Sequence, residues 1–300
     1  MTHIEGSCRA NCGFCPQART TKNKGDELSR IKWPSYDFKL FLDKLKQTSA
    51  QNLFGRICLQ TLNYPENFED AREIVSEISN LSNLPISVAI PPMPKKQLRD
   101  LKNAGVQKIA IALDAITPEI FNRVKGKGVN GPYDWNSHFK CLEKAIEIFS
   151  EGFVSTHLIM GLGESHKEFL TIVEKLHNLH VTVSLFPFNP VPHTKLEHKQ
   201  RPKITEYRKM QLAHFLIVNN KKKIEEFSFN DDGKLIDLNI SRNQLRRFVF
   251  HGDAFRTSGC SHCNRPYYTS RPSGPIYNYP ARMEKSEKEK IFALLINYIK

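Results

Sequence analysis

Short apolar runs alternate with amphipathic stretches along the first two thirds of the chain. Runs that suit buried strands lie at residues 2–5, 54–60, 86–90, 108–113, 153–160 and 181–186. Stretches with helical spacing lie between them, at residues 35–45, 67–81, 94–103, 118–124, 135–149 and 165–179. Strands that alternate with helices pair in parallel through right-handed crossovers. The pattern therefore predicts an α/β fold, a partial (β/α)6 TIM-like barrel with its chemistry at the carboxyl ends of the strands.

The pattern changes after residue 194. A helical stretch at residues 204–218 precedes short strand-like segments at 224–229 and 234–238 and a helix near 244–250. Glycine, proline and serine are frequent from residue 252 to 282, which is typical of an extended loop, and an amphipathic helix follows at 284–299. We therefore predict a barrel domain over residues 1–200 and a C-terminal extension over residues 201–300.

The composition is that of a globular protein, with 40% hydrophobic residues, seven cysteines and a formal net charge of +13. No run of about 18 apolar residues predicts a membrane span. No secretory signal is evident, so we expect a reducing cytoplasm in which the cysteines are metal ligands or core residues. The charge favours an acidic partner such as a carrier protein. Nucleic acid is the weaker candidate, because no basic stripe is interleaved with aromatic residues.

The chain begins with a CxxxCxxC motif formed by Cys8, Cys12 and Cys15. Three thiolates at this spacing can bind three irons of a 4Fe–4S cluster and leave the fourth iron without a protein ligand. Such an open iron can chelate a substrate and pass an electron to it. A disulfide framework would need an even cysteine count, and a zinc site would need a fourth close ligand, for which only His3 is near.

The motif, with the aromatic Phe14 before its last cysteine, resembles the signature of the radical S-adenosylmethionine (SAM) superfamily. This resemblance implies a barrel of the radical SAM type, with Cys8, Cys12 and Cys15 as the catalytic cluster ligands and Phe14 beside the cofactor. It also implies that SAM binds the open iron and is cleaved to methionine and a 5′-deoxyadenosyl radical.

Other residues are expected to contact SAM. Asp114 ends the fourth predicted strand, where it can accept hydrogen bonds from the ribose or, alternatively, cap the next helix. Gly161, Gly163 and Glu164 follow the fifth strand, where the family has an adenine-contacting segment; the alternative is a simple helix-entry turn with Glu164 as cap or brace. Thr61 lies where the family has a Gly-Gly-Glu segment, and backbone carbonyls there are expected to serve the SAM amino group.

A second cysteine pair, Cys260 and Cys263, forms a CxxC motif on the glycine-rich C-terminal loop. Two such thiolates hold one metal or two corners of a cluster and need partners from elsewhere. Cys58 in the second predicted strand is the best third ligand, whereas Cys141 lies in a helical pattern typical of a core residue. Zinc, a redox pair and free thiols are the alternatives. The candidates for a fourth, non-cysteine ligand are Ser258, His262, Arg271 and Ser273.

Residues 2–200 resemble the biotin-synthase-like branch of the superfamily, although Ser87 and Ser155 stand where biotin synthase has two further cysteines. Residues 259–280 resemble the tail of archaeal two-component lipoyl synthases. This resemblance implies a second iron–sulfur cluster on Cys58, Cys260 and Cys263, with Ser273 as the fourth ligand, that donates sulfur to an octanoyl chain on a carrier protein or peptide. It also implies a second, related radical SAM subunit and an electron donor such as ferredoxin.

We therefore predict a cytoplasmic radical SAM sulfurtransferase of the lipoyl synthase type. One alternative is another two-cluster radical SAM enzyme that forms carbon–carbon bonds or transfers methyl groups. The other is a noncatalytic iron–sulfur or zinc protein that binds nucleic acid, for which SAM would have no use.

Overall fold

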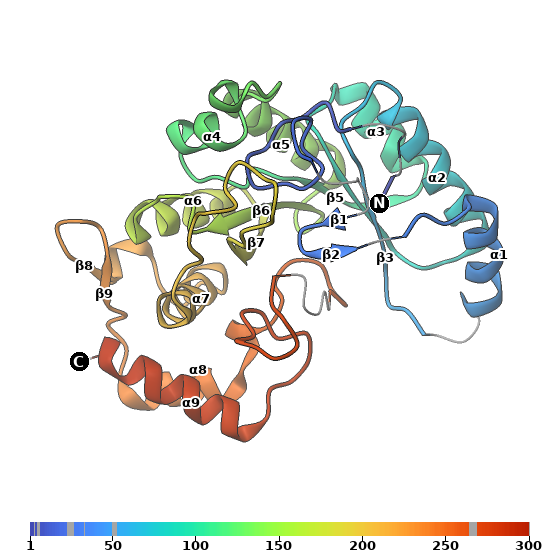
Figure 1. Cartoon of the computed structure of the whole chain (residues 1–300). Coiled ribbons are helices and arrows are strands. Elements are labelled where there is room, and N and C mark those ends of the chain that lie inside the picture. Colours follow the sequence, from blue (N-terminus) through green and yellow to red (C-terminus); the bar gives the residue numbers. More distant parts are fainter. Residues whose placement is uncertain are drawn as a thin grey trace.

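The centre of the molecule is a parallel sheet of five strands. The computed structural model describes residues 1–2, 4, 7–22, 27–32, 34–49, 53–263 and 269–299. The sheet has the order β3-β4-β5-β6-β7 and curls into a half-barrel (Figure 1). Its strands are β3 (Ile57–Gln60), β4 (Ile86–Ile90), β5 (Val106–Ile111), β6 (Val154–Met160) and β7 (Thr182–Pro187). Since each strand is parallel to the next, the carboxyl ends meet at one edge, and the predicted partial α/β barrel is confirmed.

The first predicted strand is the exception. The described residues Thr2 and Ile4 have no strand assignment, and His3 and Glu5 lie outside the described residues. The Thr2 N–H donates to the Gln60 carbonyl at 2.9 Å, and the Leu62 N–H donates to Thr2 Oγ1 at 3.0 Å. This segment lies along the edge of β3, but its ladder is too short to be a strand, so the described part of the sheet has five strands rather than six.

Helices cover the outer face of the sheet (Figure 1). Amphipathic patterning drives this packing, and Val75, Leu98, Ile109, Leu142 and Phe169 are fully buried in the resulting core. The helices of this part are α1 (Phe38–Ser49), α2 (Asn67–Leu81), α3 (Lys95–Asn103), α4 (Pro118–Val124), α5 (Trp135–Phe149) and α6 (His166–Asn178). A short hairpin of β1 (Glu27–Leu28) and β2 (Ile31–Lys32), which the hydrophobic pattern did not predict, follows the cysteine loop.

The C-terminal part packs on the last strands of the barrel. Helix α7 (Ile204–Val218) contacts α6 and β7, and its residues Tyr207 and Met210 belong to the same hydrophobic core as the sheet. The other elements of the C-terminal part are β8 (Ser228–Phe229), β9 (Leu235–Asp237), α8 (Arg242–His251) and α9 (Lys285–Leu295). The hydrophobic core is continuous across residue 200, so packing marks no boundary there. The division into two domains at this residue stays a prediction.

Buried polar side chains of α7 hold the tail that precedes α9. Arg208 donates to the carbonyls of Ile276 and Tyr277. Asn278 Oδ1 accepts from the Tyr207 hydroxyl at 3.0 Å and from Gln211 Nε2 at 2.8 Å. Asn278 Nδ2 in turn donates to the carbonyl of Leu185 in β7 at 3.0 Å. These bonds fix the tail against the edge strand β7, below the half-barrel in Figure 1.

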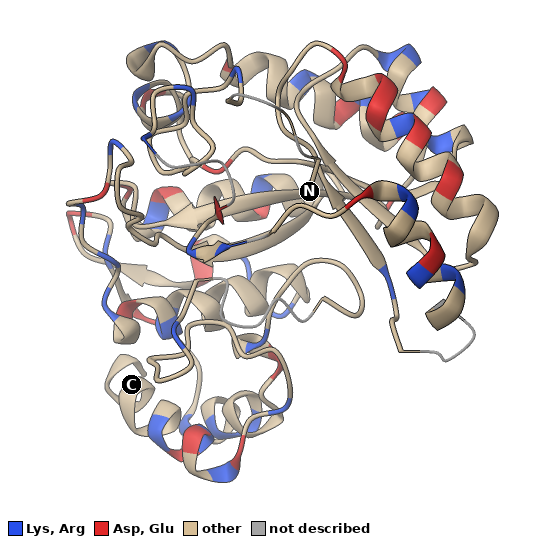
Figure 2. Cartoon of the chain, turned by 45° about the vertical axis from the view of Figure 1, so that its right-hand side comes forward, with Lys and Arg blue, Asp and Glu red and all other residues tan. Residues whose placement is uncertain are grey.

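Charged residues occur on most elements. Lys and Arg segments alternate with Asp and Glu segments along the outer helices, and further cations lie in the C-terminal part (Figure 2). Among the described residues, none of the helices combines the length and the apolar character that crossing a membrane requires.

Candidate active site

The loop with Cys8, Cys12 and Cys15 is fixed on both sides. The Gly13 N–H donates to the Val124 carbonyl at the end of α4 at 2.8 Å, and the Gly13 carbonyl accepts from the Leu196 N–H at 2.9 Å. Buried Asn11 donates to the Val129 carbonyl and accepts from the Thr20 hydroxyl at 2.8 Å. The loop is therefore shaped by protein hydrogen bonds that leave the thiols available for a ligand.

The three thiols are sheltered from water. Cys8 and Cys12 are buried and Cys15 is half-buried. Burial raises the pKa of Cys12 well above its usual range and raises the pKa of Cys15 to about 12; repulsion from neighbouring thiolates acts in the same direction. The Asn63 N–H donates to Cys8 Sγ at 3.3 Å. Thiols this hard to ionise need a cation beside them to become thiolates, and iron supplies that charge when it binds.

Asp114 lies beside this loop and is paired with Lys125. Its backbone adopts a positive φ of 64° and bonds to β6 through the His157 carbonyl and the Ile159 N–H, both at 2.8 Å. Lys125 Nζ lies 2.7 Å from Asp114 Oδ2, and the two side chains are 6% and 14% exposed. Thr117 caps α4 by accepting from the Ile120 N–H at 3.2 Å. The alternative reading of Asp114 as the cap of that helix is therefore wrong.

The pair belongs to a polar chain that reaches the cluster loop. Lys125 Nζ lies 5.1 Å from the centre of the Tyr133 ring, and the Tyr133 hydroxyl accepts from Asn63 Nδ2 at 3.1 Å. His138 packs edge-on against Tyr133, and burial, aided by the Lys125 charge, lowers the pKa of His138 to about 3. Local patterns do not mark Lys125, Tyr133 and His138, because Lys125 and Tyr133 lie in the α4–α5 connection and His138 in the first turn of α5, and only the fold brings them to the cysteines.

Two neighbouring cavities open at the carboxyl ends of the strands. One, of about 170 Å³, is lined by Cys8, Cys12, Cys15, Thr61 and Lys125 among others. The second, of about 190 Å³, is mainly apolar. Its lining includes Ile159, Phe186, Phe188 and Thr269. The lining residues common to both cavities are Phe14, Cys15, Leu28, Gln60, Asp114 and His157, so the two form one chamber. Phe14, Thr61 and Asp114 thus line the chamber beside the cysteines, and their contact with SAM stays a prediction.

The turn Gly161–Glu164 lies behind the chamber wall. Glu164 accepts from the N–H groups of Gly161 and Gly163, the latter at 2.8 Å, and burial raises its pKa. Ser165 rather than Glu164 caps α6, through a capping box with Glu168. Glu164 therefore braces the turn. The residues that line the two cavities do not include Gly161, Gly163 or Glu164, and contact of this turn with SAM stays a prediction.

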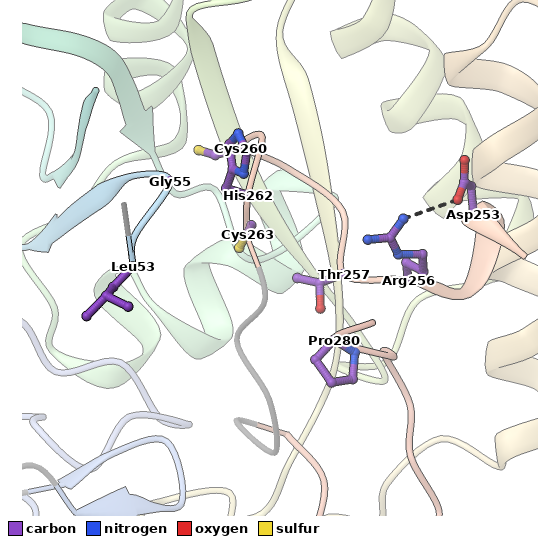
Figure 3. A pocket seen from close by; sticks show the side chains of 9 residues that line it. All are labelled: Leu53, Gly55, Asp253, Arg256, Thr257, Cys260, His262, Cys263 and Pro280. Atoms are coloured by element: carbon purple, nitrogen blue, oxygen red, sulfur yellow. Dashed lines mark hydrogen bonds and ion pairs between the residues drawn. The ribbon is translucent and has the colours of Figure 1, made fainter. Parts of the chain in front are cut away.

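The CxxC motif lies near the amino ends of the strands. Cys260 Sγ is 3.4 Å from the Ser87 hydroxyl in β4, and the Cys263 N–H donates to the Cys260 carbonyl at 3.1 Å. Cys260, His262 and Cys263 line a cavity of about 490 Å³ and lie beside Gly55, whereas Asp253 and Arg256 lie on the far side (Figure 3). The distance from residue 260 to residue 87 in sequence explains why spacing alone did not reveal this contact.

The other predicted ligands of this site are placed less closely. Cys58 is exposed on β3, where its thiol accepts from Gln60 Nε2 at 3.0 Å. Ser273 is exposed and does not line the cavity of the CxxC motif. Cys141 is buried in α5, as its helical pattern indicated. Among the described residues, no three His, Cys, Asp or Glu side chains converge tightly enough to hold a single metal ion.

Comparison with known proteins decides the family. The family model of the radical SAM superfamily matches residues 4–176, more than half of the chain. The chain belongs to the radical SAM superfamily. Members use a 4Fe–4S cluster and SAM, and the residues of the chamber fit both: three thiols lie in one cavity, and a carboxylate and apolar rings line the space next to it. Cys8, Cys12 and Cys15 would hold the cluster, which supplies the electron that cleaves SAM.

Curated relatives are biotin synthases. That of Clostridium tetani (strain Massachusetts / E88) is 24% identical over 226 residues, covering 75% of this chain and 66% of the relative. That of Methanococcus maripaludis (strain C6 / ATCC BAA-1332) is 27% identical over 204 residues, covering 66% and 57%. The matches thus span less than two thirds of the relatives' own lengths. They support the biotin-synthase-like branch of the superfamily.

Two solved structures are similar in fold. Methylornithine synthase (PylB) has a TM-score of 0.53 at 16% identity, covering 72% of this chain and 60% of its own. The FeFe-hydrogenase maturase HydG from Carboxydothermus hydrogenoformans has a TM-score of 0.54 at 19% identity, covering 72% and 50%. At such identities the likeness establishes the half-barrel fold.

Proposed function

We propose that this radical SAM enzyme inserts sulfur into an unactivated C–H bond, and that its substrate is an octanoyl chain attached to a carrier protein or peptide. The sulfur would come from a second iron–sulfur cluster held by Cys260 and Cys263 with Cys58. The similarity to biotin synthases supports sulfur insertion, and the resemblance of residues 259–280 to the lipoyl synthase tail supports the octanoyl substrate.

One observation carries the proposal: both cysteine sites belong to the same half-barrel. Cys8, Cys12 and Cys15 lie at the carboxyl ends of the strands, and Cys260 contacts Ser87 near the amino end of β4. The C-terminal tail joins the two sites, because Ser258 and Cys260 contact β7 and β4 while Thr269 lines the chamber. A radical formed on a substrate in the chamber would thus arise in the barrel that also holds the sulfur.

The chamber suits a hydrocarbon chain. Phe14, Leu28, Ile159, Phe186 and Phe188 contribute to its lining. Transfer of methylene groups from water to an apolar surface is favourable by about 0.8 kcal/mol for each buried CH2. Asp114 and Lys125 lie on the cluster side, so the polar parts of SAM and the apolar chain would occupy different ends.

The partners follow from the same proposal. An acidic carrier domain would be attracted to a chain of net charge +13, mainly through a faster encounter. A low-potential electron donor such as ferredoxin would reduce the cluster. A second, related radical SAM subunit would carry out the other sulfur insertion.

An anaerobic assay tests the function. Reconstituted enzyme, SAM, a reductant and an octanoylated peptide are incubated with and without the related subunit, and mass spectrometry detects 5′-deoxyadenosine and thiolated octanoyl product. Cys12→Ala should lower both products at least about a thousandfold, since it removes a ligand of the cluster that cleaves SAM. Cys260→Ala should keep 5′-deoxyadenosine formation and lose the thiolated product. Cys141→Ala, a core cysteine, is the matched control and should keep both.

The contrary result is equally clear. If the wild type holds two clusters and forms 5′-deoxyadenosine, yet makes no carbon–sulfur bond with or without the related subunit, the proposed reaction is wrong. Carbon–carbon bond formation or methyl transfer then takes its place.

A further inference from the structure

One of the two cysteines of the CxxC motif contacts a buried serine of the sheet. The Ser87 side chain is buried, with the residue 3% exposed, and its Oγ lies 3.4 Å from Cys260 Sγ. With metal–sulfur bonds of about 2.3 Å and metal–oxygen bonds of about 2.0–2.2 Å, two ligands of one tetrahedral ion lie about 3.5 Å apart. The two atoms are therefore already spaced as ligands of the same metal.

The register of the sheet brings Cys58 to the same place. Cys58 in β3 and Ser87 in β4 are paired, so they lie on neighbouring strands with their side chains on the same face. Ser87 is thus next to Cys58 across the two strands and in contact with Cys260. A cluster bound by Cys58 and Cys260 would lie next to the Ser87 hydroxyl.

Cations surround the serine. Arg56 Nη1 donates to Ser87 Oγ at 2.9 Å, and the same guanidinium donates to the Ser261 carbonyl and hydroxyl, both at 3.2 Å. Lys108 is paired with Ser87 in β5 and is buried close enough to Cys260 and Cys263 to interact with their charges. An N–H donor to an oxygen stabilises that oxygen when it is deprotonated, which is the form that binds metal.

The other serines considered are less suitable as oxygen ligands of the second cluster. Ser273 is exposed, whereas Ser87 is buried. Ser155 is buried on β6, but its hydroxyl donates to the Ile109 carbonyl at 3.3 Å. Ser184 contacts the tail at Gly259, one residue before the motif.

Resting on the proposed function, which requires a second cluster, we propose that Ser87 Oγ is the oxygen ligand of that cluster. In a 2Fe–2S cluster each iron has two protein ligands, so Ser87 and Cys260 would bind one iron and Cys58 and Cys263 the other, and Arg56 would donate to the bound oxygen. The Ser87 proton is released when iron binds, as the cysteine protons are. Ser87 thus replaces Ser273 as the fourth ligand of the site.

The test isolates the second cluster. In a Cys8/Cys12/Cys15→Ala background, iron and sulfide are counted and Mössbauer spectra are recorded for Ser87, Ser87→Ala and Ser87→Cys. We expect an iron with mixed oxygen and sulfur ligands in the background protein. Ser87→Cys should convert it to an all-sulfur iron with a smaller isomer shift, and Ser87→Ala should speed iron loss to a chelator at least about tenfold. Ser155→Ala and Ser273→Ala are matched controls and should change neither property.

The outcomes separate the two proposals. If the background protein binds no iron, the second cluster and the proposed function are overturned together. If it binds iron but Ser87→Ala and Ser87→Cys leave the spectrum unchanged, or if Ser273→Ala changes it, the ligand assignment alone is overturned. Thermal unfolding of the metal-free variants identifies any that fail to fold, and Ser87→Cys then provides the decisive spectrum because it keeps a side chain of similar size.

Discussion

Cys8, Cys12 and Cys15 come from one stretch of eight residues, whereas Cys260 meets Ser87 across 173 positions of sequence. The first site is a local loop whose backbone is tied to α4 and to Leu196. The CxxC motif lies on the tail and meets the barrel at Ser87 of β4, and its cavity is larger. The first site therefore depends on the loop and the buried charges beside it, while the position of the CxxC motif depends on how the tail docks.

Loss of a buried charge at the first site should change stability most. Asp114→Asn should lower the free energy of unfolding by about 3–5 kcal/mol, because it leaves the Lys125 charge buried without its carboxylate. Urea unfolding of the metal-free protein measures this. The double variant Asp114→Asn/Lys125→Met should recover most of the loss. Glu147→Gln breaks an exposed pair with Lys95 and should leave the free energy of unfolding almost unchanged. An Asp114→Asn cost as small as that would show that the pair does not build the site.

The second effect concerns the docking of the tail. Gly259 has a φ of 125°, and a methyl group there would overlap Ser184 Oγ, so Gly259→Ala should displace the CxxC motif. We expect a loss of about 1–3 kcal/mol and loss of the second cluster's iron, with the first cluster retained. Gly152→Ala has a similarly positive φ of 81° but no neighbouring atom within 4 Å, so it should keep both clusters. Equal iron contents in the two variants would contradict the docking argument.

The smallest effect is a pH dependence of the part that anchors the tail. Burial in α7 lowers the pKa of His214 to about 4, and its Nε2 lies 3.1 Å from the Val183 carbonyl. The unfolded chain takes up a proton near pH 6.5, which the folded chain does not accept until about pH 4. This contribution to stability is therefore complete above about pH 6.5 and is lost as the pH falls toward 4.

His214→Gln checks this dependence, because glutamine does not titrate and can still donate to the carbonyl. Between pH 7.5 and pH 4.5, urea unfolding should show a wild-type loss that exceeds the variant's by about 1–2 kcal/mol. Parallel curves for the two proteins would contradict the assignment.

Much of the fold could be predicted from the sequence, because amphipathic periodicity and short apolar runs are local signals. The bounds of α2, α4, α5, α7 and β4 agree with the predicted ranges. The strand expected at residues 2–5 did not form in its described residues, since an apolar run cannot show whether its neighbours leave room for a ladder. The hairpin β1–β2 has only two residues in each strand, too few for a period to appear.

The residues of the candidate site also fall into those that a local pattern marks and those that only the fold brings together. Cys8, Cys12 and Cys15 were visible because iron–sulfur ligands follow a fixed spacing, and Asp114 because it ends a strand. Lys125 was not, because a lysine after a helix acquires its role only through the segments packed against it, and Ser87 was marked only by comparison with biotin synthase and not by its contact with Cys260. Long-range contacts of this kind have no local pattern.

The tail that α7 holds has a consequence for how the molecule meets other charged molecules. Arg30 and Arg201 donate to the carbonyls of Ser270 and Thr269, as Arg208 does further along, so the tail is anchored through its acceptors and tolerates prolines. In the described residues Lys108, Lys125, Arg208 and Lys209 are buried as well. A passing anion therefore meets the field of the net charge of +13 but cannot form direct ion pairs with these buried cations.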